Sequence, residues 1–132
     1  MITLETAGGA VLGRLHHYVL HSPSGFAWGY NGSGPAETAR CLLLDALDDP
    51  RCPACAGHGL TVLTELGERP FDPDVDDELD PTVLACQDCD RSTLRTVPYQ
   101  QFKEQVVAGW TGEWWITRGD VRAWLTQQGV TP

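Results

Sequence analysis

The 132-residue sequence predicts an α+β fold, a small antiparallel β-sheet with about three helices, interrupted by an inserted segment. Three observations support this prediction. Strand-forming residues flank a Gly-Gly pair near the N-terminus, apolar residues recur at helical spacing in three later stretches, and two Cys-x-x-Cys motifs bracket an acidic region. We therefore expect residues 1–47 and 97–132 to form an α+β core domain, and residues 48–96 to form a zinc-ribbon-like insertion with an acidic loop at 65–81.

The charge of the chain is concentrated in one segment. The formal net charge is −9, and the region from Asp45 to Asp90 holds thirteen Asp and Glu against two Arg. Nucleic acids bind proteins through clustered Lys and Arg, whereas this chain has one Lys and eight Arg, scattered along the sequence. Direct nucleic-acid binding is therefore disfavoured, and another protein with a basic surface is an acceptable partner.

The sequence contains no membrane or export signal. No apolar run approaches the roughly 20 residues that span a bilayer, and the N-terminus lacks the basic and apolar regions of a signal peptide. We therefore expect a cytoplasmic protein of a bacterial host cell, with no membrane partner. In a reducing cytoplasm, paired Cys-x-x-Cys motifs indicate a metal site rather than disulfides.

The first predicted elements are a β-hairpin and a helix. Residues 2–6 and 11–20 are rich in strand-forming residues and flank a Gly-Gly turn, whose glycines supply the positive φ angles of a tight hairpin. The helix runs from about Pro35 to Leu47, because proline suits the first helical position and apolar residues recur along one face. Ser33 or Gly34 is expected to cap it.

Between these elements lies a glycine-rich stretch, "HSPSGFAWGYNGSGPAETA". Its alternating Phe26, Trp28 and Tyr30 predict one face of a strand that packs in the core before a tight turn into the helix. Alternatively, residues 25–37 bind a small ligand or a phosphate at the helix N-terminus, although no Lys lies nearby and Pro35 lacks an N–H group. We favour packing, and the exposed side of the turn that a partner could touch consists of Tyr30, Asn31 and Ser33.

The C-terminal part predicts two helices with a short strand between them. One helix begins at Pro98, with an apolar stripe at i, i+3, i+7 and i+11, and ends near Gly109 or Gly112. The strand is "EWWIT" at 113–117. Thr117 then caps the last helix and forms a Thr-x-x-Asp capping box with Asp120.

The cysteines predict a structural zinc site. Two Cys-x-x-Cys knuckles supply four thiolates in the tetrahedral arrangement that zinc accepts, one ion per chain, and the ligands are Cys52, Cys55, Cys86 and Cys89. A rubredoxin-type iron, a redox dithiol and a catalytic zinc with His58 as a ligand are weaker alternatives. Cys41, within the first helix, is expected to be a buried small apolar residue.

Two strands, at 60–66 and 82–85, are predicted to lead from one knuckle to the other. The acidic, proline-rich loop between them cannot bury much apolar surface, and we expect it to be mobile. Its charges fit a basic protein surface, although the plainer interpretation is a solvated face that keeps the chain soluble. The candidate partner-binding residues in this loop are Asp72, Asp74, Asp76, Asp77, Glu78 and Asp80.

The glycine-rich stretch resembles the signature His-Ser-Pro-x-Gly-Phe-x-Trp-Gly-Tyr-x-Gly-Ser-Gly-Pro-Ala of an uncharacterised bacterial and phage domain, domain of unknown function 6166. "YQQFKEQVVAGW" and "WWITRGDVRAWL" are similar to the C-terminal block of the same family. A short connection joins the two blocks in that family, so the cysteine-bearing segment stands here as an insertion. The resemblance implies a small intracellular protein, often carried by a phage or plasmid, and brings no established catalytic residues.

These observations favour a non-enzymatic protein-binding accessory of a phage or mobile element. It would carry one structural zinc and an acidic surface that mimics nucleic acid and thereby inhibits a host defence protein. Two alternatives stay open: a small enzyme or ligand-binding domain that uses the glycine-rich turn at 25–37, and a nucleic-acid-binding zinc ribbon.

Overall fold

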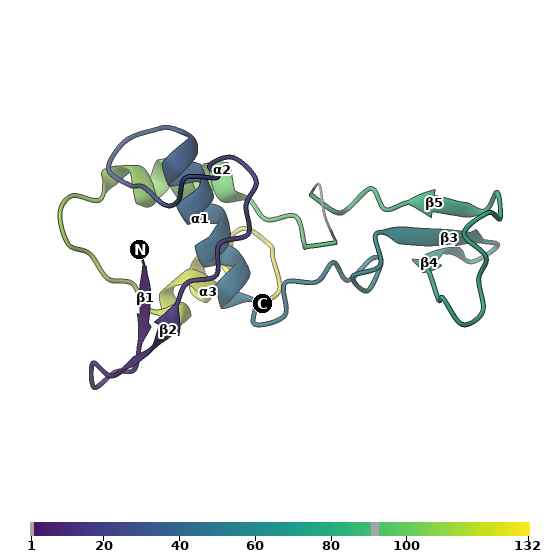
Figure 1. Cartoon of the computed structure of the whole chain (residues 1–132), viewed down its shortest axis with the longest axis horizontal. Helices are drawn as coiled ribbons and strands as arrows, with labels where there is room; N and C mark the ends of the chain where they lie inside the picture. The colour runs from purple at the N-terminus through teal and green to yellow at the C-terminus, as the bar shows by residue number, and fades with distance from the viewer. Residues whose placement is uncertain (1, 91–92) are drawn as a thin grey trace. The chain divides into compact units, whose positions relative to one another are not determined.

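A computed structural model describes residues 2–90 and 93–132. The chain divides into two units, a core unit formed by the residues up to Asp49 together with those from Val97 onward, and a cysteine unit at Pro50–Thr96. The described residues contain three α-helices, a short 3-10 helix and five strands in two antiparallel sheets (Figure 1). The predicted α+β class is therefore confirmed.

The N-terminal hairpin of the core unit is shorter than predicted. Strand β1 (Thr3–Glu5) pairs antiparallel with β2 (Val11–Arg14). We expected the second strand to extend to residue 20, but residues 15–20 are irregular. Leu15 still donates its N–H to the Ile2 carbonyl, but further along the Tyr18 carbonyl accepts from the Arg40 side chain and the Leu20 N–H donates to the Glu37 carboxylate.

Helix α1 (Ser33–Ala46) is the centre of the core unit. Almost all of its side chains are buried, and α2 (Tyr99–Gln105), the 3-10 helix η1 (Val107–Gly109) and α3 (Arg118–Gln127) all pack against it. The predicted helix is confirmed, but Gly32 occupies the capping position instead of Ser33 or Gly34, and no side chain caps it. The largest apolar side chains of this core are Leu43, Leu44, Phe102, Val107 and Leu125.

Helix α3 matches its sequence prediction more closely than helix α2 does. The capping box of α3 is confirmed, since Thr117 accepts from the Asp120 N–H and the Asp120 carboxylate accepts from the Thr117 N–H. The α2 region begins after Pro98 as predicted, but the α-helix ends at Gln105 and continues only as η1. Arg122 of α3 binds the Ala46 carbonyl at the end of α1, which ties the two helices together.

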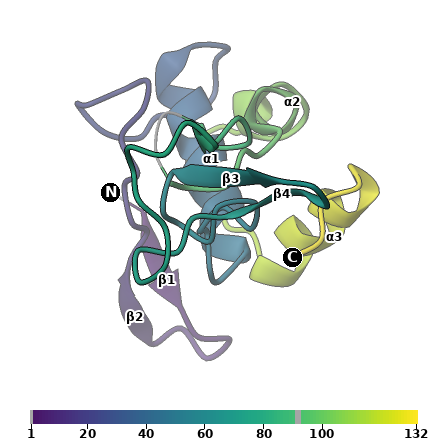
Figure 2. The same ribbon diagram turned by 90° about the vertical axis from the view of Figure 1, so that its right-hand side faces the viewer.

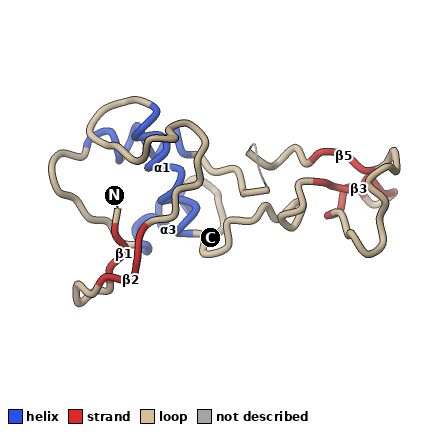
Figure 3. The backbone as a smooth tube through the Cα atoms, viewed as in Figure 1, coloured by secondary structure: helices blue, strands red, loops and turns tan. Residues whose placement is uncertain are grey.

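Two predicted strands, at 26–30 and 113–117, are wrong, because both stretches are irregular (Figure 3). The two irregular stretches contact each other through tryptophan side chains and do not pair as strands. The Trp28 indole N–H donates to the Gly112 carbonyl at 3.3 Å, and the rings of Trp110 and Trp114 stack with centroids 4.0 Å apart. Of the alternating aromatic residues, Trp28 therefore contacts the second loop, whereas Phe26 packs against His17.

The cysteine unit contains a three-stranded sheet with the order β4-β3-β5. Strand β3 (Leu60–Thr64) pairs with β4 (Gly67–Pro70) and with β5 (Val83–Ala85), and Figure 2 shows β3 and β4 side by side. The strands predicted at 60–66 and 82–85 are confirmed in shortened form. The prediction that 65–81 is one loop needs correction, because residues 67–70 form β4.

The two chain ends of the cysteine unit lie next to each other. The Cys52 N–H donates to the Thr93 carbonyl at 2.8 Å, and the Arg95 N–H donates to the Pro50 carbonyl at 2.6 Å. The entering and leaving segments are therefore held together by backbone hydrogen bonds. In the part of the chain that the structure describes, none of the helices has both the length and the apolar content that a membrane crossing requires.

Candidate metal centre

The first cysteine knuckle is built by a run of residues with positive φ. Ala56, Gly57 and Gly59 have φ angles of 53°, 83° and 77°, the left-handed region in which glycine is favoured. This backbone path turns the Gly57 N–H toward the Cys52 carbonyl and the His58 N–H toward the Cys55 carbonyl. The two cysteines of the knuckle consequently face the same point.

The second knuckle is attached to the first through backbone groups. The Cys86 N–H donates to the Gly59 carbonyl at 2.9 Å, and Cys89 pairs with Arg95 as an isolated β-bridge. The end of β5 therefore delivers Cys86 beside the first knuckle. The leaving segment of the chain holds Cys89 in place.

The four cysteine sulfurs converge on one point. All four Sγ atoms lie within 4.8 Å of one another, with Cys55 3.3 Å from Cys89 and Cys52 3.8 Å from Cys86. Four thiolates at a Zn–S distance of about 2.3 Å in a tetrahedron have sulfurs about 3.8 Å apart, which agrees with this cluster. The four close cysteines can therefore bind a metal ion such as zinc.

Hydrogen bonds favour an anionic sulfur at the centre of the cluster. Burial raises the pKa of Cys55, but donation by the Cys89 thiol and by the Gly59 and Gly57 N–H groups outweighs it and lowers that pKa to about 7. Burial raises the pKa of Cys86 above its ordinary value. A bound cation would compensate for the burial of the thiolates, and its binding would displace the remaining thiol protons.

His58 and the fifth cysteine, Cys41, lie outside the cluster. Among the described residues, the metal-ligating group consists of the four cysteines, and the exposed His58 instead places its ring near Phe71. Cys41 lies fully buried in α1, as predicted, with its thiol near the Tyr18 carbonyl. Burial raises the pKa of the Cys41 thiol to about 12, so this cysteine stays protonated.

The candidate acidic residues lie between β4 and β5 in a series of closed turns. Asp76 forms a bidentate ion pair with Arg69, at 2.7 and 2.6 Å, and this hydrogen bonding lowers the pKa of Asp76 to about 2. Asp72, Asp77 and Asp80 each accept a hydrogen bond from the N–H two residues later, which is the Asx-turn arrangement. The turns and the ion pair thus give the segment a defined backbone path, whereas its composition predicts a mobile loop.

The acidic turns also expose apolar side chains. Val75 and Leu79 are 77% and 90% exposed, and Asp74, Asp77 and Glu78 are exposed beside them. A partner that covered this surface would bury both kinds of side chain. The structure therefore places the candidate carboxylates on a surface segment of the cysteine unit.

The candidate residues of the glycine-rich turn lie at the surface. Tyr30 is 54% exposed, and Asn31 and Ser33 are exposed. The glycines nearby are explained by close packing. A Cβ atom on Gly32 would lie 2.6 Å from the Tyr30 ring, and one on Gly34 would lie 2.6 Å from the Ala27 Cβ. These contacts account for the glycines without a ligand.

Substitution of Gly34 by alanine should therefore destabilise the core unit by about 1–3 kcal/mol, as overpacking of a tight contact does. The added methyl group would collide with Ala27 and with the Tyr30 hydroxyl, which lies 2.8 Å from its position. Urea unfolding followed by tryptophan fluorescence measures the effect. Gly8→Ala is the matched control, because the nearest atom to its Cβ is 3.9 Å away. Equal stability of the two variants would contradict the packing explanation.

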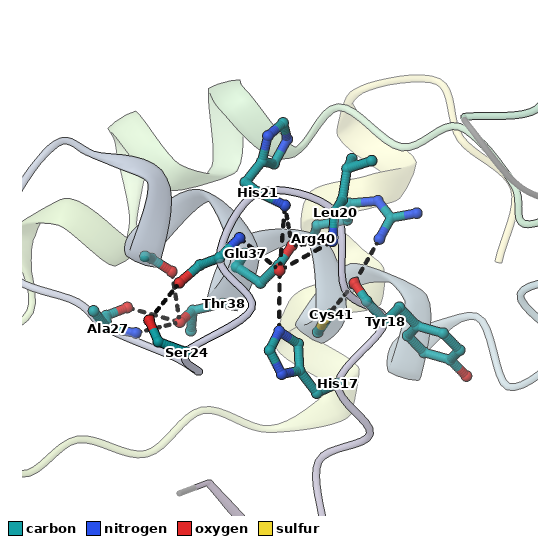
Figure 4. A network of polar contacts seen from close by, with 12 residues as sticks. His17, Tyr18, Leu20, His21, Ser24, Ala27, Glu37, Thr38, Arg40 and Cys41 are labelled. Atoms are coloured by element: carbon teal, nitrogen blue, oxygen red, sulfur yellow. Dashed lines mark hydrogen bonds and ion pairs between the residues drawn. The ribbon is translucent and has the colours of Figure 1, made fainter.

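Sequence analysis missed a polar cluster between α1 and the glycine-rich stretch (Figure 4). The Glu37 side chain is fully buried, and its carboxylate accepts hydrogen bonds from the N–H groups of Leu20, His21 and Ser22 and from His17 Nε2. The His17 distance is 3.0 Å. One carboxylate therefore holds four donors from the segment that precedes it.

Neighbouring positions of α1 extend this cluster. Thr38 donates to the Ala27 carbonyl at 2.7 Å and accepts from the Ala27 N–H at 3.0 Å, while Arg40 donates to the Tyr18 carbonyl at 2.8 Å. The signal in the sequence was the placement of Glu, Thr and Arg within a helix otherwise rich in Ala and Leu. Such residues in the first turns of a helix ordinarily face solvent. Here they instead form hydrogen bonds with backbone groups of an irregular segment, which a neighbouring strand would otherwise satisfy.

Comparison with known proteins is consistent with the motif in the glycine-rich stretch. No significant match was found among curated proteins or among solved structures. The region matched by a family model runs from β1 through α1 to the first cysteine knuckle, and thus includes the whole of the buried Glu37 cluster. Residues 2–56 match the Family of unknown function (DUF6166), which confirms the resemblance of the chain to this domain.

Proposed function

We propose that this protein is a non-enzymatic protein-binding accessory of a phage or mobile element, in which a structural zinc holds the cysteine unit and the acidic turns bind a basic protein surface. The main support for this proposal is that four cysteine sulfurs converge in a unit that has little apolar core. Among the described residues of that unit, the buried apolar side chains are Val62, Phe71 and the two cysteines of the first knuckle. So small a core requires a metal or a crosslink for stability.

We propose zinc because all four candidate ligands are cysteine sulfurs, which together complete a tetrahedral site. A site of four thiolates leaves no position for water or substrate, which is typical of structural rather than catalytic zinc. Iron uses the same four sulfurs, and metal analysis of the purified chain distinguishes the two. The proposed role of the metal is therefore to hold the sheet and its acidic turns together.

The acidic turns supply the proposed binding surface. From Asp72 to Asp80 the chain carries six carboxylates and no cation. Because the Asx turns and the Arg69–Asp76 pair fix the backbone, the charges are held in a defined arrangement. Preorganised charge improves complementarity and association rate toward a surface of the opposite sign. A host protein that ordinarily binds nucleic acid offers such a surface, and its occupation would inhibit that protein.

The test compares two variants that each lose three exposed carboxylates. The first, Asp74→Asn/Asp77→Asn/Glu78→Gln, changes the acidic turns and leaves the Arg69–Asp76 pair intact. The matched control, Glu5→Gln/Glu104→Gln/Glu113→Gln, changes the core unit. Both are used with the wild-type chain to capture proteins from host lysate. We expect the wild type and the control to retain a nucleic-acid-binding protein that duplex DNA displaces, and the first variant to lose it.

Two results would contradict the proposal. Equal capture by both variants at low and high salt would show that the acidic turns do not bind the partner, since exposed charges act strongly only at low ionic strength. Direct binding of duplex or single-stranded DNA by the wild-type chain in a gel shift would favour a nucleic-acid-binding ribbon instead.

A further inference from the structure

The two cysteine knuckles differ in their exposure. Cys52 and Cys55 of the first knuckle are 1% and 0% exposed, whereas Cys86 and Cys89 of the second are only half-buried. A small neutral oxidant such as hydrogen peroxide therefore reaches the second knuckle first. Thiolates are the form of cysteine that such oxidants attack.

The close sulfur pairs each join one knuckle to the other. Cys55 and Cys89 are 3.3 Å apart at Sγ, and Cys52 and Cys86 are 3.8 Å apart. A disulfide bond is about 2.0 Å long, so either pair needs only a short approach. Each exposed cysteine thus has a buried cysteine of the other knuckle in position to react with it.

We propose that the cysteine cluster is a reversible peroxide-sensitive switch, in which oxidation joins Cys55 to Cys89 and Cys52 to Cys86 and releases the metal ion. The inference rests on the zinc proposed above. Loss of the ion would loosen the sheet that carries the acidic turns. Oxidation would therefore weaken partner binding, and reduction would restore it.

The chemistry balances with one peroxide for each disulfide. The Cys89 thiolate attacks one oxygen of hydrogen peroxide, the O–O bond breaks, and a sulfenic acid and a hydroxide form. The Cys55 thiolate then attacks the sulfenic sulfur, forms the S–S bond and expels a second hydroxide. Two protons from solvent convert the hydroxides to water, so two electrons pass from the sulfurs to the peroxide.

Backbone contacts favour the disulfide over further oxidation. The Cys86 N–H bond to the Gly59 carbonyl and the Cys52 N–H bond to the Thr93 carbonyl hold the knuckles together without using any sulfur. The resolving thiol therefore lies beside the sulfenic acid at the moment it forms, before the unit unfolds. Cys41 takes no part, because it is fully buried and its pKa is raised to about 12.

The experiment uses the full chain loaded with zinc. Metal content is measured first, then hydrogen peroxide is added in steps, released zinc is followed with a chromogenic chelator, and remaining thiols are blocked with N-ethylmaleimide. Cleavage after glutamate, at Glu65 and Glu78, separates the two Cys-x-x-Cys motifs. A disulfide between knuckles then joins two peptides in the mass spectrum, whereas a disulfide within a knuckle does not.

We expect about two equivalents of peroxide to release the zinc, joined peptides to accumulate in parallel, and dithiothreitol with added zinc to restore the starting state. The Cys41→Ala variant should behave identically. Disulfides within the knuckles, or accumulation of sulfinic acids, would overturn the switch. A chain that purifies without zinc would instead contradict the proposed structural metal, so the two failures are distinguishable.

Discussion

Chelation of the metal is expected to unfold the cysteine unit while α1, α2 and α3 keep their structure. Structural zinc contributes an apparent binding free energy of about 10–16 kcal/mol at pH 7 in small domains. The few buried apolar residues of the unit cannot replace such a contribution. The helices have their own core, in which Leu43, Phe102 and Leu125 are buried, and no residue of that core is a candidate ligand.

Hydrogen exchange followed by mass spectrometry, with and without a chelator, measures this effect. Amide protection in β3 should fall to the level of an unfolded chain, whereas protection in α1 should change little. Cys52→Ser should reproduce the chelated pattern in the presence of zinc, and Cys41→Ala should keep the zinc-bound pattern. Persistent protection of β3 after complete removal of the metal would contradict the prediction.

The features predicted correctly from the sequence have local causes. The Gly-Gly turn fixes the hairpin between β1 and β2, because Gly9 adopts a φ of 87°, a backbone angle that glycine favours. Thr117 and Asp120 define the start of α3 through hydrogen bonds within four residues. The two Cys-x-x-Cys motifs each bring two sulfurs together within a single turn, and the structure places all four side by side.

The features that sequence analysis missed depend on partners distant in the chain. Strand β4 exists because Gly67–Pro70 pairs with β3, although its own residues are poor strand formers. The Trp28 ring packs edge-on against Trp114 in a distant loop instead of facing a strand partner. The burial of Glu37 follows from donors up to 20 residues away, and no local pattern shows which side chain will receive them.

Replacement of Glu37 is expected to be the most damaging substitution in the core unit. Glu37→Ala removes the acceptor of three backbone N–H groups and of His17, and leaves these donors buried without it. Loss of one partner from a buried, charged hydrogen-bond network costs about 3–5 kcal/mol. Glu37→Gln keeps one acceptor oxygen and should therefore lose less stability than Glu37→Ala. Glu104→Ala, at an exposed position of α2, is the control and should change stability by less than about 0.5 kcal/mol.

The same carboxylate should make the stability of the core unit depend on acid pH. Burial raises the pKa of Glu37, but the Leu20 and Ser22 N–H groups, His17 and the His21 N–H outweigh it, so the pKa lies below its ordinary value of 4.5. A lowered carboxyl pKa contributes stability that is fully present above the unfolded-state value and is lost as pH falls through the folded-state value. Urea midpoints measured by tryptophan fluorescence should therefore decrease below about pH 4.5 more steeply for the wild type than for Glu37→Gln. Parallel pH profiles for these two proteins would assign the acid sensitivity to other groups.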